Sequence, residues 1–401
     1  MAKEEKKAPK LRFNGYTNDW EQVKLEKIAT FSKGKGYSKL DLKRKGYPIF
    51  LYGQMYTNYR YKIVETSTYA ILKEDAVVSN GNEIVIPSSG ETSVDIARAS
   101  WIAQKGIIIG SDLNIIRPTS SVHPLFLALS LSNNQVKYNL AKVAQGNSIV
   151  HLYNNNLKKV NIYFPNIVEQ NRIGNILNSI SNCINLHERK CEELALIKKA
   201  LLQKLFPKKD EFKPEVRYKN FSDAWEQRKL GEVATFINGR AYKQNELLDS
   251  GKYKVLRVGN FYTNDSWYYS NLELADKYYI DEGDLVYTWS ATFGPHIWNG
   301  EKVIYHYHIW KIELSKFLDR DFTLQILEAD KAKLLANTNG STMIHVTKKD
   351  MESKVISLPN IEEQKKIGSY LMKFDSLITL HQRKLEKLKQ LKKFLLQNMF
   401  I

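Results

Sequence analysis

"WEQVKLEKIATF" spans Trp20–Phe31, and "WEQRKLGEVATF" spans Trp225–Phe236. The two stretches agree at eight of twelve positions and lie 205 residues apart in a chain of 401 residues. So close an agreement at such a distance indicates an internal repeat, and a repeat decides how the rest of the sequence is divided.

A second pair of similar stretches closes each repeat. "FPNIVEQNRIGNIL" begins at Phe164, and "LPNIEEQKKIGSYL" begins at Leu358, which is an offset of 194 residues. The segments between the opening and closing motifs share little sequence, and the second is about eleven residues shorter. Each repeat therefore places a similar frame around a divergent middle.

Each closing motif leads into a long heptad pattern, with apolar residues at alternating spacings of four and three, as in a coiled-coil seam. The seam positions are Ile173, Leu177, Ile180, Ile184, His187, Cys191, Leu194, Leu201 and Leu205 in the first pattern, and Ile367, Leu371, Phe374, Ile378, His381, Leu385, Leu388, Leu395 and Met399 in the second. Lys198 and Lys392 interrupt the two seams at the same place. The first helix would be roughly 55 Å long at about 1.5 Å per residue. Because the order is globule, helix, globule, helix, a paired arrangement must be antiparallel, with an approximate two-fold axis.

The divergent middles read as mixed α+β structure. In the first middle the patterns predict strands over 47–53, 82–87 and 106–118, followed by a helix over 123–143. In the second they predict strands over 253–261, 283–290 and 302–314, followed by a helix over 322–337. Trp20 and Trp225, which open the two frames, are expected to be core residues.

The bulk composition is that of a globular protein with a basic surface. Lys and Arg number 60 against 43 Asp and Glu, a net charge of +17, which favours a polyanionic partner. The length predicts two or more domains. No signal peptide or run of roughly 18 apolar residues occurs, so a cytoplasmic location without membrane insertion is expected. The two cysteines, Cys183 and Cys191, lack the spacing of a zinc site or a disulfide framework.

No catalytic constellation is recognisable in the sequence. There is no GxxxxGK[ST] phosphate loop, and the "FSKGKG" stretch loses its second glycine in the repeat partner "FINGRA". His306 and His308 would alternate on a strand face with Trp310, which favours core packing over metal ligation. Nothing combines a nucleophile with a base and an orienting group. We therefore expect a non-catalytic chain with no cofactor and no metal.

Two variable globules, each opening with W-E-x-x-K-L…A-T-F and closing with P-x-x-x-E-Q-x-x-I into a heptad helix, resemble the specificity (S) subunit of type I restriction-modification systems. The resemblance covers essentially the whole chain, and both repeats carry it. It implies an α+β fold of two target-recognition domains of mixed α/β type, separated by an antiparallel two-helix coiled coil with an internal pseudo-two-fold repeat. The expected division is 1–164 for the first domain, 165–206 for the first helix, 207–358 for a linker and the second domain, and 359–401 for the second helix.

The resemblance also implies a function. Each domain would read one half of an asymmetric bipartite site in double-stranded DNA, while the paired helices set the spacer and dock two modification (methyltransferase) subunits. Restriction (motor-nuclease) subunits would join that complex, and the cofactors of DNA methylation and cleavage would belong to those other chains. Two alternatives stay open at this point: the specificity chain of a related system with a fused nuclease-methyltransferase partner, and a coiled-coil scaffold with no role on DNA.

Candidate DNA contacts are polar, basic or aromatic residues in the loops and strand ends of the divergent middles, because phosphate contacts set position while contacts to base edges set sequence. In the first repeat they are Lys33, Lys35, Tyr37, Gln54, Tyr56, Asn58, Arg60, Glu91, Thr92, Asn147 and Ser148. In the second they are Arg240, Tyr242, Lys243, Arg257, Asn260, Tyr262, Asn264, Ser290, Thr292, His296, Ser341 and Thr342.

Overall fold

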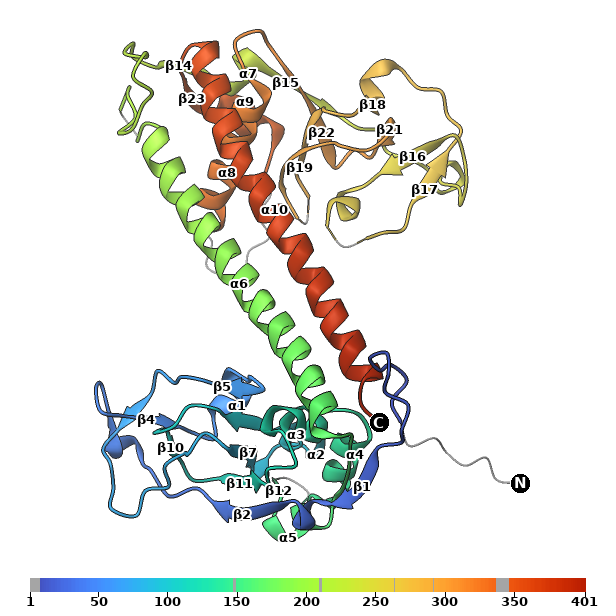
Figure 1. Ribbon diagram of the computed structural model, residues 1–401. Coiled ribbons are helices and arrows are strands. Elements are labelled where there is room, and N and C mark those ends of the chain that lie inside the picture. The colour runs from blue at the N-terminus through green and yellow to red at the C-terminus, as the bar shows by residue number, and fades with distance from the viewer. Residues whose placement is uncertain (1–7, 147–148, 209–210, 263, 291, 337–345) are drawn as a thin grey trace. The chain divides into compact units, whose positions relative to one another are not determined.

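The computed structural model describes residues 8–146, 149–208, 211–262, 264–290, 292–336 and 346–401. The chain forms two compact units. The first comprises the chain up to Glu188 together with Arg383–Ile401, and the second comprises Arg189–Gln382. Each unit therefore contains one globular repeat and a part of each long helix (Figure 1).

The opening and closing motifs of each repeat are paired strands. In the first unit, β1 (Glu21–Lys24) pairs antiparallel with β13 (Asn161–Phe164). In the second unit, β14 (Glu226–Lys229) pairs in the same way and in the equivalent register with β23 (Val355–Leu358). The similarity between the repeats thus falls on the two strands that join the start of each globule to the start of its long helix.

The middle of the first unit contains two mixed sheets. A five-stranded sheet has the order β2-β11-β7-β9-β5, a four-stranded sheet has the order β10-β4-β6-β3, and β12 pairs with β8. The strands are β2 (Ala29–Lys33), β3 (Leu42–Lys43), β4 (Tyr47–Phe50), β5 (Lys62–Ile63), β6 (Tyr69–Ala70), β7 (Glu83–Pro87), β8 (Ser89–Gly90), β9 (Ser100–Ile102), β10 (Ile108–Ile109), β11 (Leu113–Pro118) and β12 (Val150–His151).

The second unit repeats this plan with fewer strands. An antiparallel sheet has the order β15-β22-β19-β20, and a mixed sheet has the order β17-β16-β21-β18. The strands are β15 (Ala234–Asn238), β16 (Tyr253–Leu256), β17 (Tyr268–Ser270), β18 (Tyr279–Ile280), β19 (Leu285–Thr288), β20 (Gly294–Ile297), β21 (Val303–Tyr305) and β22 (Ile309–Leu314).

The helices cover these sheets or continue from them. Those of the first unit are α1 (Gln54–Thr57), α2 (Ser93–Ile96), α3 (Pro124–Leu131), α4 (Asn134–Val143) and α5 (Asn154–Lys158). Those of the second are α7 (Leu230–Val233), α8 (Arg320–Ala336) and α9 (Lys348–Ser353). The two long helices are α6 (Ile167–Leu205) and α10 (Ile361–Asn398). A single 3₁₀ turn, η4 (Val258–Phe261), matters for the site described below.

Three predicted elements are broken in the structure. The strand predicted over 106–118 is two strands, since β10 ends at Ile109 and β11 begins at Leu113. The helix predicted over 123–143 is two helices, α3 and α4, because Asn134 adopts a left-handed backbone conformation with φ 48° at the junction. The strand predicted over 302–314 is also wrong as one element, since β21 ends at Tyr305 and β22 begins at Ile309. His306 and His308 lie in the turn between these strands, so the expectation that they alternate on one strand face with Trp310 is wrong.

A buried ion pair joins the segment before the opening strand to the start of each long helix. Arg12 donates to both carboxylate oxygens of Glu169, at 2.8 and 2.7 Å. Arg217 donates to both oxygens of Glu363 at 2.7 Å each. Both carboxylate side chains are fully buried. The glutamate of the closing P-x-x-x-E-Q motif therefore has the same structural role in the two repeats.

The tryptophans of the opening motifs are core residues, as predicted. Trp20 is 2% exposed, and its ring lies 5.6 Å from that of Phe126 and 6.5 Å from that of Phe400, at the end of α10. Trp225 is also 2% exposed and packs in the same way on Phe322 and on Phe206, at the end of α6. Each globule is therefore closed by the last turn of the long helix of the other repeat.

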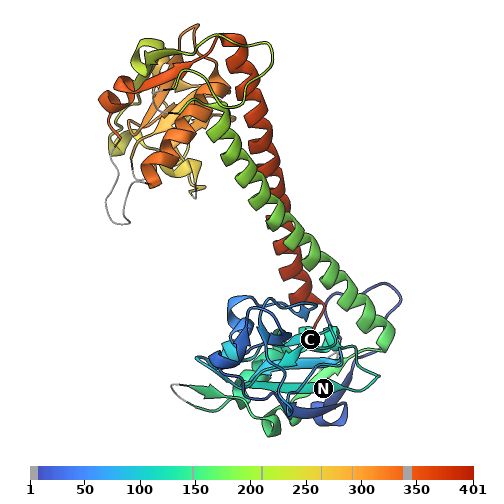
Figure 2. The same ribbon diagram turned by 90° about the vertical axis from the view of Figure 1, so that its left-hand side faces the viewer.

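The two long helices pack together antiparallel within each unit, which confirms the predicted fold class (Figures 1 and 2). In the first unit, where the C-terminal end of α10 lies against the globule, Lys389 Nζ lies 2.7 Å from Glu188 Oε1. In the second unit, Lys198 Nζ lies 2.5 Å from Asp375 Oδ1. The buried seam residues include Ile173, Leu177, Ile180, Ile184, Leu395 and Met399 in the first unit and Leu205, Ile367 and Leu371 in the second.

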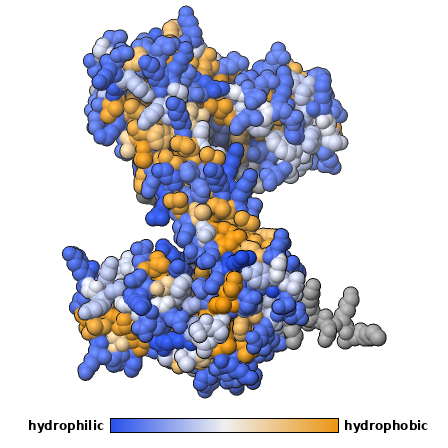
Figure 3. Space-filling model, in the orientation of Figure 1, coloured by the Kyte–Doolittle hydropathy of each residue, from blue (hydrophilic) through white to orange (hydrophobic). Residues whose placement is uncertain are grey.

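Other apolar residues of the long helices are exposed to solvent, and Figure 3 shows hydrophobic surface along the helical segments. In the first unit, the exposed residues include Leu186 on α6 and Leu391 and Phe394 on α10. In the second unit they include Leu377 and Leu380 on α10. Among the described helices, none is both long enough and apolar enough to cross a membrane.

Candidate nucleic-acid interface

A polar cleft of about 340 Å³ lies beside α1 in the first unit, and we call it the first cleft. Gln54, Asn58 and Arg60, three of the predicted DNA contacts, line it. The Gln54 side chain is held in place because its Oε1 accepts from the Leu51 backbone N–H at 2.8 Å and its Nε2 donates to Thr66 Oγ1 at 3.0 Å. Asn58 and Arg60 are exposed. The first cleft thus combines an amide that is held by hydrogen bonds with an exposed amide and an exposed guanidinium.

The sequence did not single out the other polar lining of the first cleft. Glu65, Thr66 and Ser67 complete it, together with Tyr69. A carboxylate can accept a hydrogen bond from the cytosine amino group, and a hydroxyl can either donate or accept one at a base edge. The only sequence signal for these residues is their position in a polar stretch between two short strands, which is too common to be diagnostic.

Two predicted contacts of the first unit have structural roles instead. The Tyr56 hydroxyl donates to the Ser89 carbonyl at 3.1 Å, Arg98 lies 4.8 Å from the ring centroid, and burial raises the pKa of Tyr56 to about 12. Thr92 is the N-cap of α2, where its Oγ1 accepts from the Asp95 backbone N–H at 3.0 Å. Both residues therefore tie α1 and α2 to the neighbouring turn.

The remaining described candidates of this unit are spread over its surface. Lys33 Nζ lies 5.8 Å from the centroid of the Tyr153 ring, and Lys35 Nζ lies 3.3 Å from Asp75 Oδ2. Both lysines are exposed cations that suit contacts to phosphate. Glu91 is exposed in the turn before α2.

Tyr37 is a packing residue of the four-stranded sheet. Its ring lies against the small apolar cluster that contains Ile49 and Ile108, and Lys73 Nζ lies 4.6 Å from the ring centroid. Its hydroxyl accepts a hydrogen bond from the Lys73 backbone N–H at 3.3 Å. These contacts leave Tyr37 half-buried and fixed beside the sheet.

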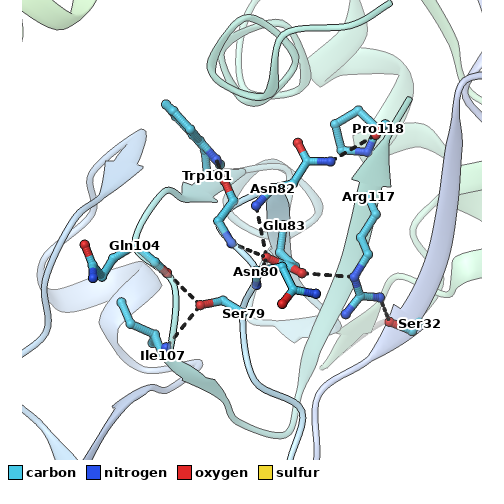
Figure 4. Close-up of polar contacts among 11 residues, drawn as sticks. Ser32, Ser79, Asn80, Asn82, Glu83, Trp101, Gln104, Ile107, Arg117 and Pro118 are labelled. Atoms are coloured by element: carbon cyan, nitrogen blue, oxygen red, sulfur yellow. Dashed lines mark hydrogen bonds and ion pairs between the residues drawn. The ribbon is translucent and has the colours of Figure 1, made fainter. Parts of the chain in front are cut away.

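A buried carboxylate of the first unit, Glu83, has a structural role (Figure 4). Glu83 is 1% exposed, and its Oε2 accepts from the backbone N–H groups of residues 80–82 at 2.9 to 3.1 Å. Its Oε1 accepts from Arg117 Nε at 3.1 Å, and Arg117 Nη1 donates to Ser32 Oγ at 2.7 Å. Because both carboxylate oxygens are engaged, Glu83 fixes the turn before β7 against β11 and β2.

In the second unit, several predicted contacts between β16 and β17 are joined by hydrogen bonds around η4. The Arg257 backbone N–H donates to Asn260 Oδ1 at 3.0 Å, and Asn260 Nδ2 donates to the Ser266 carbonyl at 3.0 Å. Asn264 Oδ1 accepts from the Ser266 backbone N–H at 2.9 Å. The Arg257 guanidinium lies 4.2 Å from the centroid of the Tyr268 ring. The two asparagines therefore shape the loop, and the arginine is the side chain that the loop holds.

Tyr262 and His296, which come from different elements, are brought together beside this loop. The Tyr262 hydroxyl lies 3.1 Å from His296 Nε2, and the imidazole stacks on Phe261 with a centroid distance of 4.3 Å. Burial, with a smaller effect from Lys331, lowers the pKa of His296 to about 4. The imidazole is therefore neutral at pH 7 and suits hydrogen bonding to a base edge better than attraction to a phosphate. We call Arg257, Asn260, Tyr262, Asn264 and His296 the second surface.

The other candidates of the second unit are less uniform. Arg240 is occupied by Glu246, to which it donates two hydrogen bonds at 3.0 and 2.7 Å. Tyr242 is largely buried, and its hydroxyl lies 3.5 Å from the Tyr305 carbonyl. Lys243 is exposed. Only the lysine has the freedom expected of a direct phosphate contact.

The sequence missed an aromatic turn that lies between the ends of strands in the second unit. The turn is His306–His308, and Trp289 Nε1 donates to the Tyr307 carbonyl at 3.0 Å. The rings of Trp289 and His308 lie 5.0 Å apart. Burial lowers the pKa of His306 to about 4, with smaller contributions from His308 and Arg257. The signal that could have found this turn is the pair of histidines that interrupts the apolar pattern of residues 302–314.

Ser290 and Thr292 lie in the loop between β19 and β20, and Thr292 is exposed. Asn147, Ser148, Ser341 and Thr342, the four small-loop candidates, lie outside the described residues. Within the part of the chain that the structure describes, no group of three or more His, Cys, Asp or Glu side chains is arranged to hold a metal ion.

The sequence profile of the Type I restriction modification DNA specificity domain matches the chain twice, over residues 17–196 and residues 222–390. One match falls on each repeat, and together they cover well over half of the chain.

Individual relatives carry the same description. The chain is 24% identical to the type I restriction enzyme MjaVIII specificity subunit of Methanocaldococcus jannaschii over 398 residues, which cover 94% of this chain and 90% of the relative. It is 28% identical over 305 residues to the putative MjaX specificity subunit of the same organism, covering 72% of this chain and 70% of the relative. It is 25% identical to the EcoBI specificity subunit of Escherichia coli over 174 residues, 43% of this chain and 36% of the relative.

Among solved structures, the S subunit of a type I restriction-modification system from M. genitalium superposes with a TM-score of 0.69 at 16% identity, covering 98% of this chain and 99% of that chain. At this identity the likeness shows a common fold. The double profile match carries the family assignment. The chain therefore belongs to the DNA specificity subunits of type I restriction-modification systems, whose part in the complex is recognition rather than catalysis.

Proposed function

We propose that each globular repeat reads one half of an asymmetric, bipartite target in double-stranded DNA. The supporting observation is that equivalent frames, closed by the same strand pair and the same Arg–Glu ion pair, carry different polar surfaces. The first cleft offers Gln54, Asn58 and Arg60, whereas the second surface offers Arg257 and His296. Amide side chains pair with adenine and guanidinium groups with guanine, so different sets would select different half-sites.

The proposed division of labour follows the expected boundaries. Residues 1–164 and 207–358 act as the target-recognition domains, and residues 165–206 and 359–401 form the helices that set the spacer. Two readers that approach one face of a duplex need half-sites about one helical turn apart, roughly 10 bp from centre to centre. Several base pairs between the half-sites would then go unread.

The proposed contacts to the phosphate backbone come from exposed cations and from the small loops. Lys33, Lys35 and Lys243 are exposed, and they belong to a chain with a net charge of +17. When lysines neutralise DNA phosphates they release bound counterions, so the affinity for DNA falls strongly as the salt concentration rises. The small loops around Asn147 and Ser341, which precede the long helices in the sequence, are proposed to clamp the DNA backbone.

Two methyltransferase subunits are proposed to dock on the long helices, one on each unit. The support is the exposed apolar surface outside the buried seam, at Leu186, Leu391 and Phe394 in one unit and at Leu377 and Leu380 in the other. Apolar side chains left exposed on a helix favour a protein partner. Restriction subunits would join this complex, and the chemistry of methylation and cleavage would take place in those partners.

The test is an exchange of one divergent middle. Replacing the segment between Phe236 and Leu358 by that of another family member should change one half-site and preserve the other. The readout is genome-wide mapping of methylated bases in a host that carries the complete system. The reciprocal exchange, between Phe31 and Phe164, is the matched control and should change the opposite half. A single exchange that altered both halves would refute the modular reading.

A further inference from the structure

A lysine interrupts the apolar seam at the same position in both long helices. Lys198 on α6 and Lys392 on α10 are 194 residues apart, which is the offset of the repeat. Both lysines are partly buried: the Lys198 side chain is 14% exposed, and burial lowers the pKa of Lys392. An ammonium group in such a place needs an anion or several acceptors to offset its lost hydration.

In the second unit this need is met by the protein itself. Lys198 Nζ donates to Asp375 Oδ1 at 2.5 Å. The other carboxylate oxygen of Asp375 accepts from Gln325 Nε2, on α8, at 2.8 Å. Lysine, carboxylate and amide therefore form a closed network between α6, α10 and α8.

The first unit lacks both partners at the equivalent positions. The repeat offset of 194 places Ser181 where the second unit has Asp375. Gln170 accepts a hydrogen bond from the His123 backbone N–H, and Gln364 accepts the equivalent bond from the Asp319 backbone N–H. This shared contact aligns His123 with Asp319, and so α3 with α8. In this alignment the residue equivalent to Gln325 is Leu129. The Ser181 hydroxyl donates to the Leu177 carbonyl at 2.7 Å, within its own helix.

Lys392 consequently faces a pocket without a counterion. The pocket has a volume of about 230 Å³, and its lining includes Lys392, Arg60, Lys62 and three asparagines, Asn178, Asn182 and Asn185. No carboxylate lines it. The described residues form no ion pair with Lys392, whose ammonium lies 5.2 Å from the centroid of the Tyr61 ring. The charge of Glu188 acts on Lys392 and partly offsets the effect of burial on its pKa, but the ion pair of Glu188 is with Lys389.

Three cations and three amide groups around a small cavity are the lining of an anion site. Amide N–H groups and ammonium or guanidinium groups are the donors that bind phosphate oxygens. Arg60 is a shared wall, since it lines both this pocket and the first cleft. DNA that lies in the first cleft would therefore present a neighbouring phosphate to this pocket. Arg60 would contact that phosphate from the wall that the cleft and the pocket share.

We infer that this pocket, which we call the Lys392 pocket, binds a phosphate of the DNA backbone next to the half-site read by the first unit. The inference rests on the proposed function of the first cleft. It assigns DNA contact to the long C-terminal helix, which the sequence assigned only to spacing and docking. The second unit, with its own carboxylate in this place, has no equivalent phosphate site.

The test compares the assembled methyltransferase complex containing the wild-type chain with one containing Lys392→Met, by titration of duplex DNA at several salt concentrations. Loss of one phosphate contact should reduce the slope of log affinity against log salt by about 0.9. The advantage of the wild type should therefore shrink roughly three- to fourfold between about 50 and 200 mM salt. The effect should be the same on specific and non-specific duplexes, because a phosphate contact carries no sequence information.

Lys198→Met is the matched control, because it alters the equivalent lysine and breaks an ion pair with Asp375. It should lower the melting temperature of the complex and leave the salt slope unchanged. Lys392→Arg should retain the wild-type slope, which separates loss of charge from loss of packing.

An unchanged slope for Lys392→Met would overturn the inference. If that variant instead recovered fewer methyltransferase subunits while its slope stayed normal, the occupant would be an acidic group of the partner protein and the phosphate assignment would be wrong. Failure of the proposed function has a different signature, namely wild-type complex that binds specific and non-specific duplexes equally well.

Discussion

Glu169 and Glu363 illustrate how single residues hold the repeated frame. Each carboxylate is fully buried, and each accepts two hydrogen bonds from an arginine that precedes the opening strand, Arg12 or Arg217. A buried ion pair adds little net stability, but removing one partner leaves an uncompensated charge at a cost of about 3–5 kcal/mol. The pair therefore serves to fix where the long helix begins relative to the chain that precedes the globule.

Arg257 is the residue for which the structure makes the sharpest prediction about base reading. Its guanidinium is held over the Tyr268 ring and its loop is shaped by Asn260, so it is positioned before DNA arrives. Arg257→Ala should relax one position of one half-site by about 1–3 kcal/mol, the usual worth of a bidentate contact to guanine. The measurement is binding to a panel of duplexes with single base changes in either half-site.

The other half-site is the internal control for this variant and should keep its full discrimination. A uniform loss of affinity across the whole panel would contradict base reading and would make Arg257 a phosphate contact. The sequence alone identified this arginine but could not rank it above Arg240. The difference is tertiary, because Glu246 occupies the guanidinium of Arg240 and no carboxylate occupies that of Arg257 among the described ion pairs.

At the scale of elements, local sequence predicted the long helices and the framing motifs well. Their heptads and closing P-N-x-x-E-Q motifs are periodic signals within one segment, so no distant contact is needed to read them. The broken helix fails for the opposite reason. The helix over 123–143 stops at Asn134 because that residue serves α10, more than 250 positions away along the chain. Nothing in the local pattern records such a partner.

Asn134 supplies the prediction at this scale. Its Nδ2 donates to the carbonyls of Leu396, Gln397 and Phe400, at 3.2, 3.3 and 2.9 Å, which satisfies acceptors left open where α10 ends. Asn134→Gly keeps the left-handed backbone accessible but removes these bonds. We expect the amides of the last turn of α10 to exchange faster with solvent deuterium, by roughly five- to thirtyfold for a loss of about 1–2 kcal/mol.

Asn133→Ala is the neighbouring control, since the Asn133 side chain bonds within the first globule, to the Leu129 carbonyl at 2.7 Å. It should leave exchange at the end of α10 unaltered. Unchanged protection there in Asn134→Gly would mean that the packing of Phe400 against Trp20 and Phe126 holds the helix end without the asparagine.

For the whole molecule, the repeat explains why neither long helix belongs to one unit alone. The end of α6 packs on Trp225 through Phe206, and the end of α10 packs on Trp20 through Phe400, so each globule contains the last turn of the helix that begins in the other repeat. Because the two frames are equivalent and each includes the helix end of the other repeat, two different half-sites can be read when only the divergent middles differ. The frame could be predicted from the sequence because it occurs twice. The first cleft and the second surface each occur once, so neither could be recognised by comparing one repeat with the other.

The length of the paired helices carries the last prediction. Removing one heptad from each, residues 184–190 and the equivalent 378–384, keeps the seam in register and shortens each helix by about 10 Å. If the helices set the distance between half-sites, methylation should move to sites whose spacer is about three base pairs shorter, since stacked base pairs rise about 3.4 Å each. Mapping of methylated bases would reveal the new spacing. Deleting the heptad from α6 alone shifts one seam against the other and should prevent assembly rather than change the spacer. A double deletion that assembles and still methylates the original sites would show that the spacing is set elsewhere in the complex.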